Sequence, residues 1–424
     1  MSSARMWLLA IILLGVLGGA GWYVFQKEDV VVEIPVVQEI VAEVKGLQPI
    51  TPTSRTLALG DEEVASFRLA EGFDINVAAE EVGKARFMAL APDGRLFVPD
   101  MVNYNLSHQG KLNVLGGFDP ATGTFATKHT YLSGLRTPNS VAFYRDENGK
   151  DWLYLALTAH LVRYPYKAGD TKPSGPQEIV AEFPNSQSPG EVSVVWHITR
   201  TIFFHEGRVY VSVGSGCNAC EQLTGDMRAM IYSMKPDGSD KKVYGDGLRN
   251  TVGITIAEGE LYATANGVDH LGEDAPEEMM YHVEEGKNYG WPYCYAMDGK
   301  MVSDTSRTWD NPKDCASVPS PLTTFEPRSA PLGLRFFDSS AHPALAGSFL
   351  VALHGSFEAH MRSGNKIMRV TPEGEQSVFM DGFQKADSDE RWARPVDFLQ
   401  YDANSFFFSD DEGGRIYFVR ATGA

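Results

Sequence analysis

The 424-residue chain has little cysteine and fewer basic than acidic residues. Its 37 Lys and Arg stand against 55 Asp and Glu, which gives a formal net charge of −18. Binding to phosphates needs a basic surface, so this balance argues against a nucleic-acid partner. The chain contains no C-x-x-C-H motif, which excludes a fused c-type haem domain within it. Helix signals are nearly absent beyond the N-terminal segment, so a helical body is not expected.

One long hydrophobic run is present, at residues 7–25, and it contains no charged residue. These 19 residues can just cross a bilayer core as a helix. Arg5 precedes the run and acidic residues follow Lys27, which places the N-terminus inside and the body outside the cytoplasm. We therefore predict that residues 1–26 anchor the protein in a membrane, with its body on the periplasmic or extracellular side. The alternative is a signal peptide cleaved near residues 18–20, which would give a secreted protein.

The four cysteines are Cys217, Cys220, Cys294 and Cys315. The first two form a C-x-x-C pair, and the last two bracket a loop of irregular sequence. An even number of cysteines in an exported protein favours two disulfides, Cys217–Cys220 and Cys294–Cys315. A zinc ion held by four thiolates is the alternative, which a cytosolic location would favour.

A repeat runs through the body of the chain. Residues 27–63 are first rich in Val and Glu and then polar with prolines, and we predict that they form a linker. From about residue 64, a turn followed by an aromatic or β-branched strand recurs six times. The copies are spaced by 55, 58, 52, 88 and 57 residues, counted between Gly94, Gly149, Gly207, Gly259, Gly347 and Asn404.

A period of roughly 50–60 residues with strand–turn–strand content indicates propeller blades. We predict an all-β, six-bladed β-propeller over residues 64–424, preceded by the N-terminal transmembrane or signal helix. The longest spacing predicts an insertion in the fourth blade. An unrelated array of β-sandwiches is the alternative.

The most specific pattern in the chain runs from residue 247 to 295. It contains GLRNTVG at 247–253, the acidic loop NGVDHLGEDAPEE at 266–278 and the corner GKNYGWPYCY at 286–295. This order of parts resembles the glucose/sorbosone dehydrogenase family, six-bladed propellers that oxidise sugars with pyrroloquinoline quinone (PQQ). Similar segments are VALHGSFEAHMRSGNKIMRV at 351–370 and RWARPVDF at 391–398 with SDDEGGRIYFV at 409–419. The resemblance covers about residues 64–420.

The resemblance implies roles for individual residues. It makes His197, in WHITRT, the base that takes the hydroxyl proton during sugar oxidation. It makes Arg249 the group that bonds a quinone carbonyl and stabilises charge on its oxygen. Further cofactor contacts implied by the matching segments are Asn139, Arg200, Asn250, Lys366 and Arg394. By residue type alone, a structural loop histidine and ordinary ion pairs stay open as alternatives.

The acidic loop resembles the family segment that lies near the cofactor's metal. It implies a Ca²⁺ site at Asp274 and Glu278, because clustered carboxylates suit a hard cation. The chain departs from the family pattern here, with Met279 at the usual glutamate position and Tyr281 at the usual asparagine position. A solvated acidic loop is the alternative to a metal site.

A second departure lies at Glu358-Ala359, where the family has Asn-Arg after the aromatic residue. A basic contact to the anionic cofactor is missing there. Lys366 or Arg362 is the candidate to replace it.

These features together predict a PQQ-dependent oxidoreductase that oxidises an aldose or related sugar at its anomeric hydroxyl. Hydride would pass to the quinone, Ca²⁺ would be a second cofactor, and an external acceptor would remove the electrons. One alternative is a non-catalytic cell-surface propeller that lost the cofactor and binds carbohydrate or a partner, which Met279, Tyr281 and Ala359 favour. The other is a lactonase-like metal-dependent hydrolase, against which the combination of His197 and Arg249 argues.

Overall fold

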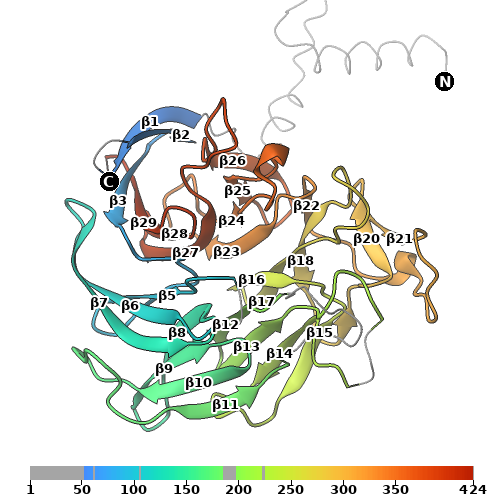
Figure 1. The fold of residues 1–424 in the computed structure, drawn as a ribbon, viewed down its shortest axis with the longest axis horizontal. Coiled ribbons are helices and arrows are strands. Elements are labelled where there is room, and N and C mark those ends of the chain that lie inside the picture. The colour runs from blue at the N-terminus through green and yellow to red at the C-terminus, as the bar shows by residue number, and fades with distance from the viewer. Residues whose placement is uncertain (1–51, 61–62, 105–106, 185–196, 222–224, 424) are drawn as a thin grey trace, which may run out of the picture. The chain divides into compact units, whose positions relative to one another are not determined.

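A computed structural model describes residues 52–60, 63–104, 107–184, 197–221 and 225–423. Six of their seven β-sheets are arranged as blades around a central axis (Figure 1), so the predicted all-β, six-bladed propeller is confirmed. The predicted N-terminal helix and most of the predicted linker lie outside the described residues. Among the residues that are described, no helix is long and apolar enough to span a membrane.

Blades 1 to 3 are built from consecutive strands, the first of each being innermost. Blade 1 contains β4 (Ala89–Leu90), β5 (Leu96–Asp100), β6 (Gly110–Asp119) and β7 (Thr124–Leu135). Blade 2 contains β8 (Ser140–Arg145), β9 (Asp151–Ala156), β10 (His160–Pro165) and β11 (Glu178–Glu182). Blade 3 contains β12 (Arg200–His205), β13 (Arg208–Val213), β14 (Met230–Met234) and β15 (Lys242–Asp246), to which β19 (Lys287–Asn288) adds a short parallel edge.

Blades 4 to 6 carry the additions to this plan. Blade 4 contains β16 (Thr251–Ala257), β17 (Glu260–Ala265), β18 (Glu278–Val283) and β22 (Thr323–Phe325). Blade 5 contains β23 (Pro331–Phe337), β24 (Ser348–Leu353), β25 (Lys366–Val370) and β26 (Gln376–Asp381), extended by β2 (Glu63–Ala70) and β1 (Pro52–Leu59). Blade 6 contains β27 (Pro395–Asp402), β28 (Ser405–Asp410), β29 (Arg415–Ala421) and β3 (Phe73–Ala79).

The six sequence repeats are the turns into the second strand of each blade, β5, β9, β13, β17, β24 and β28. The ring closes where β3, from the beginning of the described chain, pairs with β29 near its end. β1 pairs with β2 along its whole length, so residues 52–59 belong to blade 5 although the sequence places them in the linker. Strands at both ends of the chain are thus joined by sheet hydrogen bonds.

The hydrophobic core lies between neighbouring blades. At the junction of blades 6 and 1, Phe118 packs against Phe407 and Phe418, with ring centroids 4.8 and 4.9 Å apart. Burying such a ring contributes about 1.5–3 kcal/mol. Packing of this kind fixes the positions of the inner strands and therefore of the loops that connect to them.

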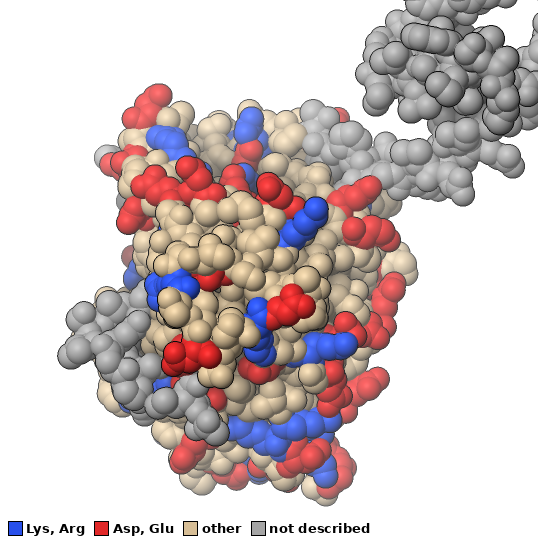
Figure 2. All heavy atoms as spheres, turned by 90° about the vertical axis from the view of Figure 1, so that its right-hand side faces the viewer, with Lys and Arg blue, Asp and Glu red and all other residues tan. Residues whose placement is uncertain are grey.

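The predicted insertion in blade 4 is confirmed between β18 and β22. It contains the hairpin of β20 (Cys294–Met297) and β21 (Lys300–Ser303) and the 3₁₀ turn η1 (Cys315–Ser317). Both predicted disulfides are formed, Cys217–Cys220 and Cys294–Cys315, and no free cysteine remains among the described residues. The zinc alternative is therefore wrong. On the face shown in Figure 2, acidic side chains are spread widely between smaller groups of basic ones.

Candidate functional site

A cavity of about 760 Å³ lies at one end of the inner strands. Its walls are the segments that precede the first strand of a blade or follow the second strand. The side chains with chemistry to offer are Lys84, Arg86, Tyr104, His197, Arg249, Asn250, Asp269, Glu273, Glu278, Arg328, His354, Glu358, Arg394 and Asp411. Five residues predicted from motifs line the cavity. Four of them form what we call the motif wall: His197, Arg249, Asn250 and Glu278. The fifth, Arg394, belongs to the wall across the cavity.

His197 precedes β12, and its Nδ1 lies 3.0 Å from the carbonyl oxygen of Ser215 and 2.9 Å from Ser215 Oγ. Because that hydroxyl donates its own proton to the carbonyl of Cys217 at 2.6 Å, Ser215 presents two acceptors, and the imidazole proton resides on Nδ1. Nε2 is then the nitrogen that can take up a proton. Burial, and next the charge of Arg249, lower the pKa of His197 well below 6.5. The imidazole is therefore neutral at pH 7 and able to act as a base.

Arg249 is held by the loop of the C-x-x-C disulfide. Its Nε donates to the carbonyl of Asn218 at 2.9 Å, and Nη2 donates to Asn218 Oδ1 and Asp269 Oδ2, both at 2.8 Å. Asn218 lies between Cys217 and Cys220, so the disulfide constrains the residue that orients the guanidinium. Burial lowers the pKa of Arg249, and Asp269 opposes this effect. An arginine stays charged under such conditions.

The other two residues of the motif wall are also fixed by short contacts. Asn250 Nδ2 donates to Asn266 Oδ1 at 2.7 Å, and Asn266 in turn donates to the carbonyl of Pro331 at 3.0 Å. Glu278 begins β18 and accepts a hydrogen bond from the backbone N–H of Gly267 at 2.7 Å. Burial raises the pKa of Glu278 to about 7. A cation bound next to this carboxyl would stabilise its ionised form and lower its pKa.

Asn139 and Arg200 lie behind the cavity and do not line it. Arg200 donates to the carbonyls of His197 at 2.8 Å and Thr199 at 2.7 Å, so it supports the segment that carries His197. Asn139 accepts from Arg86 Nε at 3.0 Å and donates to the carbonyl of Arg200 at 3.0 Å. Both side chains therefore position residues of the cavity wall and are not placed to contact a ligand directly.

The wall across the cavity comes from blades 1, 5 and 6, next to the point where the ring closes. We call it the closure wall, and it contains Lys84, Arg86, His354, Arg394 and Asp411. Asp411 accepts from Arg86 Nη1 at 2.7 Å and pairs with His354 Nε2 at 2.7 Å. Burial alone would raise the pKa of Asp411, but His354, Arg86 and Arg394 hold it well below its usual value.

Burial also lowers the pKa values of two further residues of the closure wall, His354 and Arg394. Burial, and next the charge of Arg394, lower the pKa of His354 to about 4, so this imidazole is neutral at pH 7. Arg394 donates to the carbonyls of His354 at 3.1 Å and Gly355 at 2.6 Å. Burial lowers its pKa to about 10, which still leaves the guanidinium charged.

Several residues predicted for the site lie elsewhere. Lys366 is in β25 and forms an ion pair with Glu326 at 2.8 Å. Asp274 is exposed and does not line the cavity. Met279 and Tyr281, the departures from the family pattern, face a hydrophobic cluster instead, and the Tyr281 hydroxyl donates to the Met279 sulfur at 2.9 Å. Strand alternation explains this, since neighbouring residues of β18 point to opposite faces.

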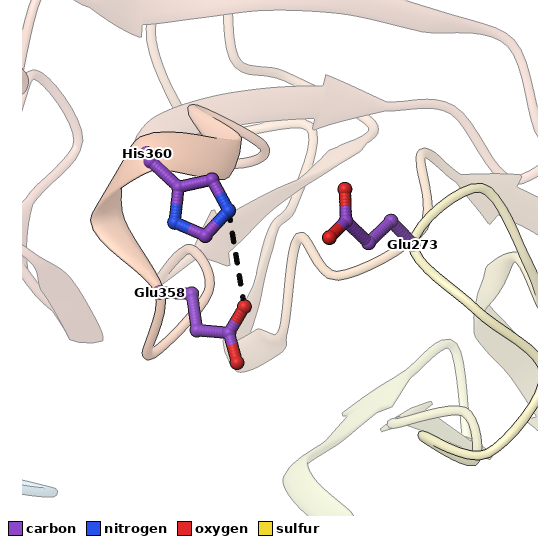
Figure 3. A group of neighbouring side chains, drawn as sticks. All are labelled: Glu273, Glu358 and His360. Carbon is purple, nitrogen blue, oxygen red and sulfur yellow. Dashed lines mark ion pairs between the residues drawn. The ribbon is translucent and has the colours of Figure 1, made fainter.

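The mouth of the cavity is aromatic and acidic. Tyr104 and Phe357 approach each other there, with ring centroids 6.2 Å apart. Figure 3 shows Glu273, from the loop between β17 and β18, opposite Glu358 and His360 near the 3₁₀ turn η2 (Ala359–Met361). The ligand atoms of these three exposed residues lie within 4.8 Å of one another. This group of possible metal ligands contains neither Asp274 nor Glu278.

Sequence reasoning did not select Lys84, Arg86, Asn218, His354 or Asp411 as site residues. His354 and Asp411 lie within the HGS and SDD segments that match the family, so those motifs carried a signal for them. Asn218 was marked only by its place between two cysteines. No motif marks Lys84 and Arg86, whose role depends on which blades meet.

Comparisons with known proteins show the family and the fold of the chain. The family model described as TrAA12-like matches residues 67–422. The chain belongs to this family. The family resemblance seen in the sequence is thereby confirmed, and the propeller described above is the fold of a TrAA12-like protein.

Solved structures show the same fold. A structure titled "Holo form of Pyranose Dehydrogenase PQQ domain from Coprinopsis cinerea" has a TM-score of 0.63 at 19% identity, covering 84% of this chain and 97% of that one. The calcium structure of a Trichoderma reesei family AA12 protein has a TM-score of 0.66 at 18% identity, covering 89% and 98%. Apo aldose sugar dehydrogenase from Escherichia coli has a TM-score of 0.58 at 13% identity, covering 82% and 99%.

One curated relative is an uncharacterized protein of Borreliella burgdorferi, 28% identical over 222 residues. The match covers 50% of this TrAA12-like chain and 57% of that protein. The chain thus spans somewhat more than half the length of the curated relative that it matches.

Proposed function

We propose that the protein is a PQQ-dependent oxidoreductase that oxidises an aldose or a related sugar at its anomeric hydroxyl. The observation that carries this proposal is the meeting of His197 and Arg249 in one large cavity with several cationic side chains. The solved structures of similar fold include a pyranose dehydrogenase PQQ domain and an aldose sugar dehydrogenase. Their names support the choice of substrate class and cofactor.

The residues present fit an anionic planar cofactor. The cavity is about 760 Å³, and Lys84, Arg86, Arg249, Arg328 and Arg394 line it. Guanidinium groups recognise carboxylates and carbonyl oxygens by paired hydrogen bonds. When bound, PQQ would supply the two-electron oxidant that accepts hydride from the sugar.

The chain's own residues would then handle the proton and the charge. His197 Nε2 accepts the proton of the anomeric hydroxyl as the C–H bond of the same carbon is cleaved, and a lactone results. Arg249 would stabilise negative charge next to the cofactor. Asn250 and Arg394 would hold the cofactor in place. Electrons leave to an external acceptor.

We place Ca²⁺ at Glu278, the residue of the predicted pair that lines the cavity. A buried carboxylate is a ligand that Ca²⁺ prefers. A calcium structure within the AA12 group supports this choice of ion. Asp274, which is exposed and outside the cavity, is not part of the proposed site.

We also propose that the body works outside the cytoplasm, anchored through residues 1–26. The two disulfides support an oxidising compartment. Protease treatment of spheroplasts, in which only the cytoplasmic membrane is intact, would test this, since a body outside that membrane is degraded while a cytoplasmic one is protected.

The enzyme proposal is tested by titrating the full-length protein with PQQ in the presence of Ca²⁺ and following dye reduction with a panel of aldoses. Saturable turnover that disappears in Arg249→Ala is the expected result. A folded protein that neither binds PQQ nor turns over sugar would contradict it. The non-catalytic binding propeller would then be the better description, with sugar binding by calorimetry as its test.

A further inference from the structure

The cavity has an uneven distribution of charge, which bears on how an anionic ligand is bound. On the side of the motif wall, Arg249 and Arg328 both pair with Asp269, and the buried carboxyl of Glu278 lies nearby. Two cations are therefore matched by acidic groups on that side.

On the closure wall three cations face one carboxylate. Arg86 pairs with Asp411 at 2.7 Å. The guanidinium of Arg394 donates only to backbone carbonyls, and among the described residues Lys84 forms no ion pair. Because His354 is the neutral partner of the same Asp411, the closure wall has two positive charges more than negative ones, whereas the acidic Glu273 and Glu358 lie together at the mouth.

The segment that carries Lys84 and Arg86 is held firmly. The backbone N–H of Lys84 donates to Asp100 Oδ1 at 2.9 Å, and that of Arg86 donates to the carbonyl of Pro99 at 2.9 Å. Gly83 has a φ of +77°, and a Cβ there would lie 2.2 Å from Cγ of Asp100, so this tight approach needs glycine. The side chains of Lys84 and Arg86 both line the cavity.

The replacements expected from the sequence do not supply such a charge. Lys366 is neutralised by Glu326 outside the cavity. Arg362 donates to the carbonyls of Lys385 and Ser388 at 3.2 and 2.7 Å and does not line the cavity either. Glu358 and the neighbouring Ala359 bring no positive charge to the mouth.

We propose that Lys84 and Arg86, together with Arg394, form the carboxylate-binding wall of the cavity and supply the charge that is absent at Glu358-Ala359. This inference rests on the proposed function, because the ligand is the tricarboxylate PQQ. Lys84, Arg86 and Arg394 would hold the carboxylates of the cofactor, and Arg249 and His197 would remain for the reacting groups. Lys84 would bind the cofactor's carboxylates, and Arg86 would both bind them and keep Asp411 in place.

The test compares PQQ affinity in two lysine variants of the full-length protein. Equilibrium dialysis with detection of PQQ absorbance requires no turnover. Lys84→Gln is expected to weaken binding about 10- to 100-fold, the usual effect of losing a charged hydrogen bond. Lys84→Arg, which keeps the charge, is expected to retain most of the affinity.

Lys366→Gln is the matched control, because it also removes one lysine charge but lies outside the cavity. Its affinity for PQQ is expected to equal that of the wild type. The urea unfolding midpoint of Lys84→Gln is expected to be unchanged, since the side chain makes no ion pair within the described residues.

The possible outcomes separate the two proposals. If wild type binds PQQ and Lys84→Gln binds it equally well, the carboxylate-binding wall is wrong while the proposed function stands. If the folded wild-type protein binds no PQQ, both are wrong. An equal loss in Lys84→Gln and Lys366→Gln would show a general charge effect and would also overturn the assignment.

Discussion

The two walls of the cavity differ in how the chain assembles them. In the motif wall, the contacts that orient His197, Arg249 and Glu278 join residues 11 to 31 positions apart. In the closure wall, the ion pair of Arg86 with Asp411 joins residues 325 positions apart. The first set can form within two adjacent blades, whereas the second requires the ring to be closed.

The two walls therefore differ in what they contribute, the motif wall to the proposed reaction and the closure wall also to the stability of the fold. The motif wall holds the proposed base and the group that stabilises charge, and its residues touch local loops. The closure wall holds a buried charge network that also ties blade 1 to blade 6. Damage to the motif wall should therefore stop the reaction in a folded protein, while breaking the Arg86–Asp411 pair of the closure wall should destabilise the fold itself.

The largest effect is expected for His197→Ala. Removing the proposed base should lower kcat by about 10²- to 10⁴-fold, while the fold persists because the His197 contacts are local. Stopped-flow measurement of dye reduction, with circular dichroism of the same sample, checks both parts. His282→Ala is the control, since this half-buried histidine pairs with Glu260 and does not line the cavity. Equal rates in the two variants would remove His197 from the reaction.

The next effect concerns stability and belongs to the closure wall. Asp411→Asn leaves Arg86 buried without its carboxylate and should cost about 3–5 kcal/mol of the free energy of unfolding. Denaturant unfolding measures it. Asp381→Asn removes a carboxylate that pairs with the exposed Arg68 and should cost less than about 1 kcal/mol. Similar losses in both variants would mean that the Arg86–Asp411 pair stabilises the fold no more than the exposed Arg68–Asp381 pair does.

A smaller effect is expected in the pH dependence of stability. The pKa of His354 is lowered to about 4 in the folded protein, against about 6.5 when unfolded. The unfolded chain therefore binds the proton first, and stability present above pH 6.5 is lost as pH falls toward 4. Each unit of pKa difference corresponds to about 1.4 kcal/mol.

The opposite sign applies to Asp397 and Asp410, whose pKa values burial raises to about 7. They bind protons in the folded state first, so they add stability as pH falls from 7 toward 4. Comparing wild type with His354→Gln cancels their contribution. Wild type should lose more free energy of unfolding than the variant between pH 7 and 4, and parallel curves would contradict the assignment.

The smallest effect is expected at the mouth, where the walls meet solvent. Phe357 is 83% exposed, so Phe357→Ala should change the free energy of unfolding by no more than about 0.5 kcal/mol. The ring lies beside Tyr104 and 5.7 Å from the Arg394 guanidinium. We expect KM for the sugar to rise by a few fold with kcat unchanged. A loss of kcat would place this ring nearer to the reacting atoms.

The sequence was a good guide to parts that depend on nearby residues. Gly247 to Asn250 and the C-x-x-C segment predicted a site and one of the two disulfides, and the structure places these together. The sequence was a poorer guide where the alternation of side chains along a strand decided which residue faces the cavity. By motif position, Met279 replaces the glutamate that the family has near the metal. The pleat of β18 instead points Met279 into the core and Glu278 into the cavity.

Motif position also failed for Lys366, which β25 directs toward Glu326. Similarly, Arg200 and Asn139 matched family segments yet serve as supports behind the wall. A motif conveys which residue types follow one another, but not which side chain of a segment faces the cavity.

The sequence by itself determined the number of blades, the position of the insertion, the cysteine pairs and the motif wall. Each of these follows from turn spacing or from residues close in the chain. Only the tertiary structure decided that Lys84, Arg86 and Asp411 join the predicted Arg394 in the closure wall, because Arg86 and Asp411 meet only when β3 pairs with β29. Closing the ring brings together charges from both ends of the chain, and no local pattern of residues encodes which of them will face one another.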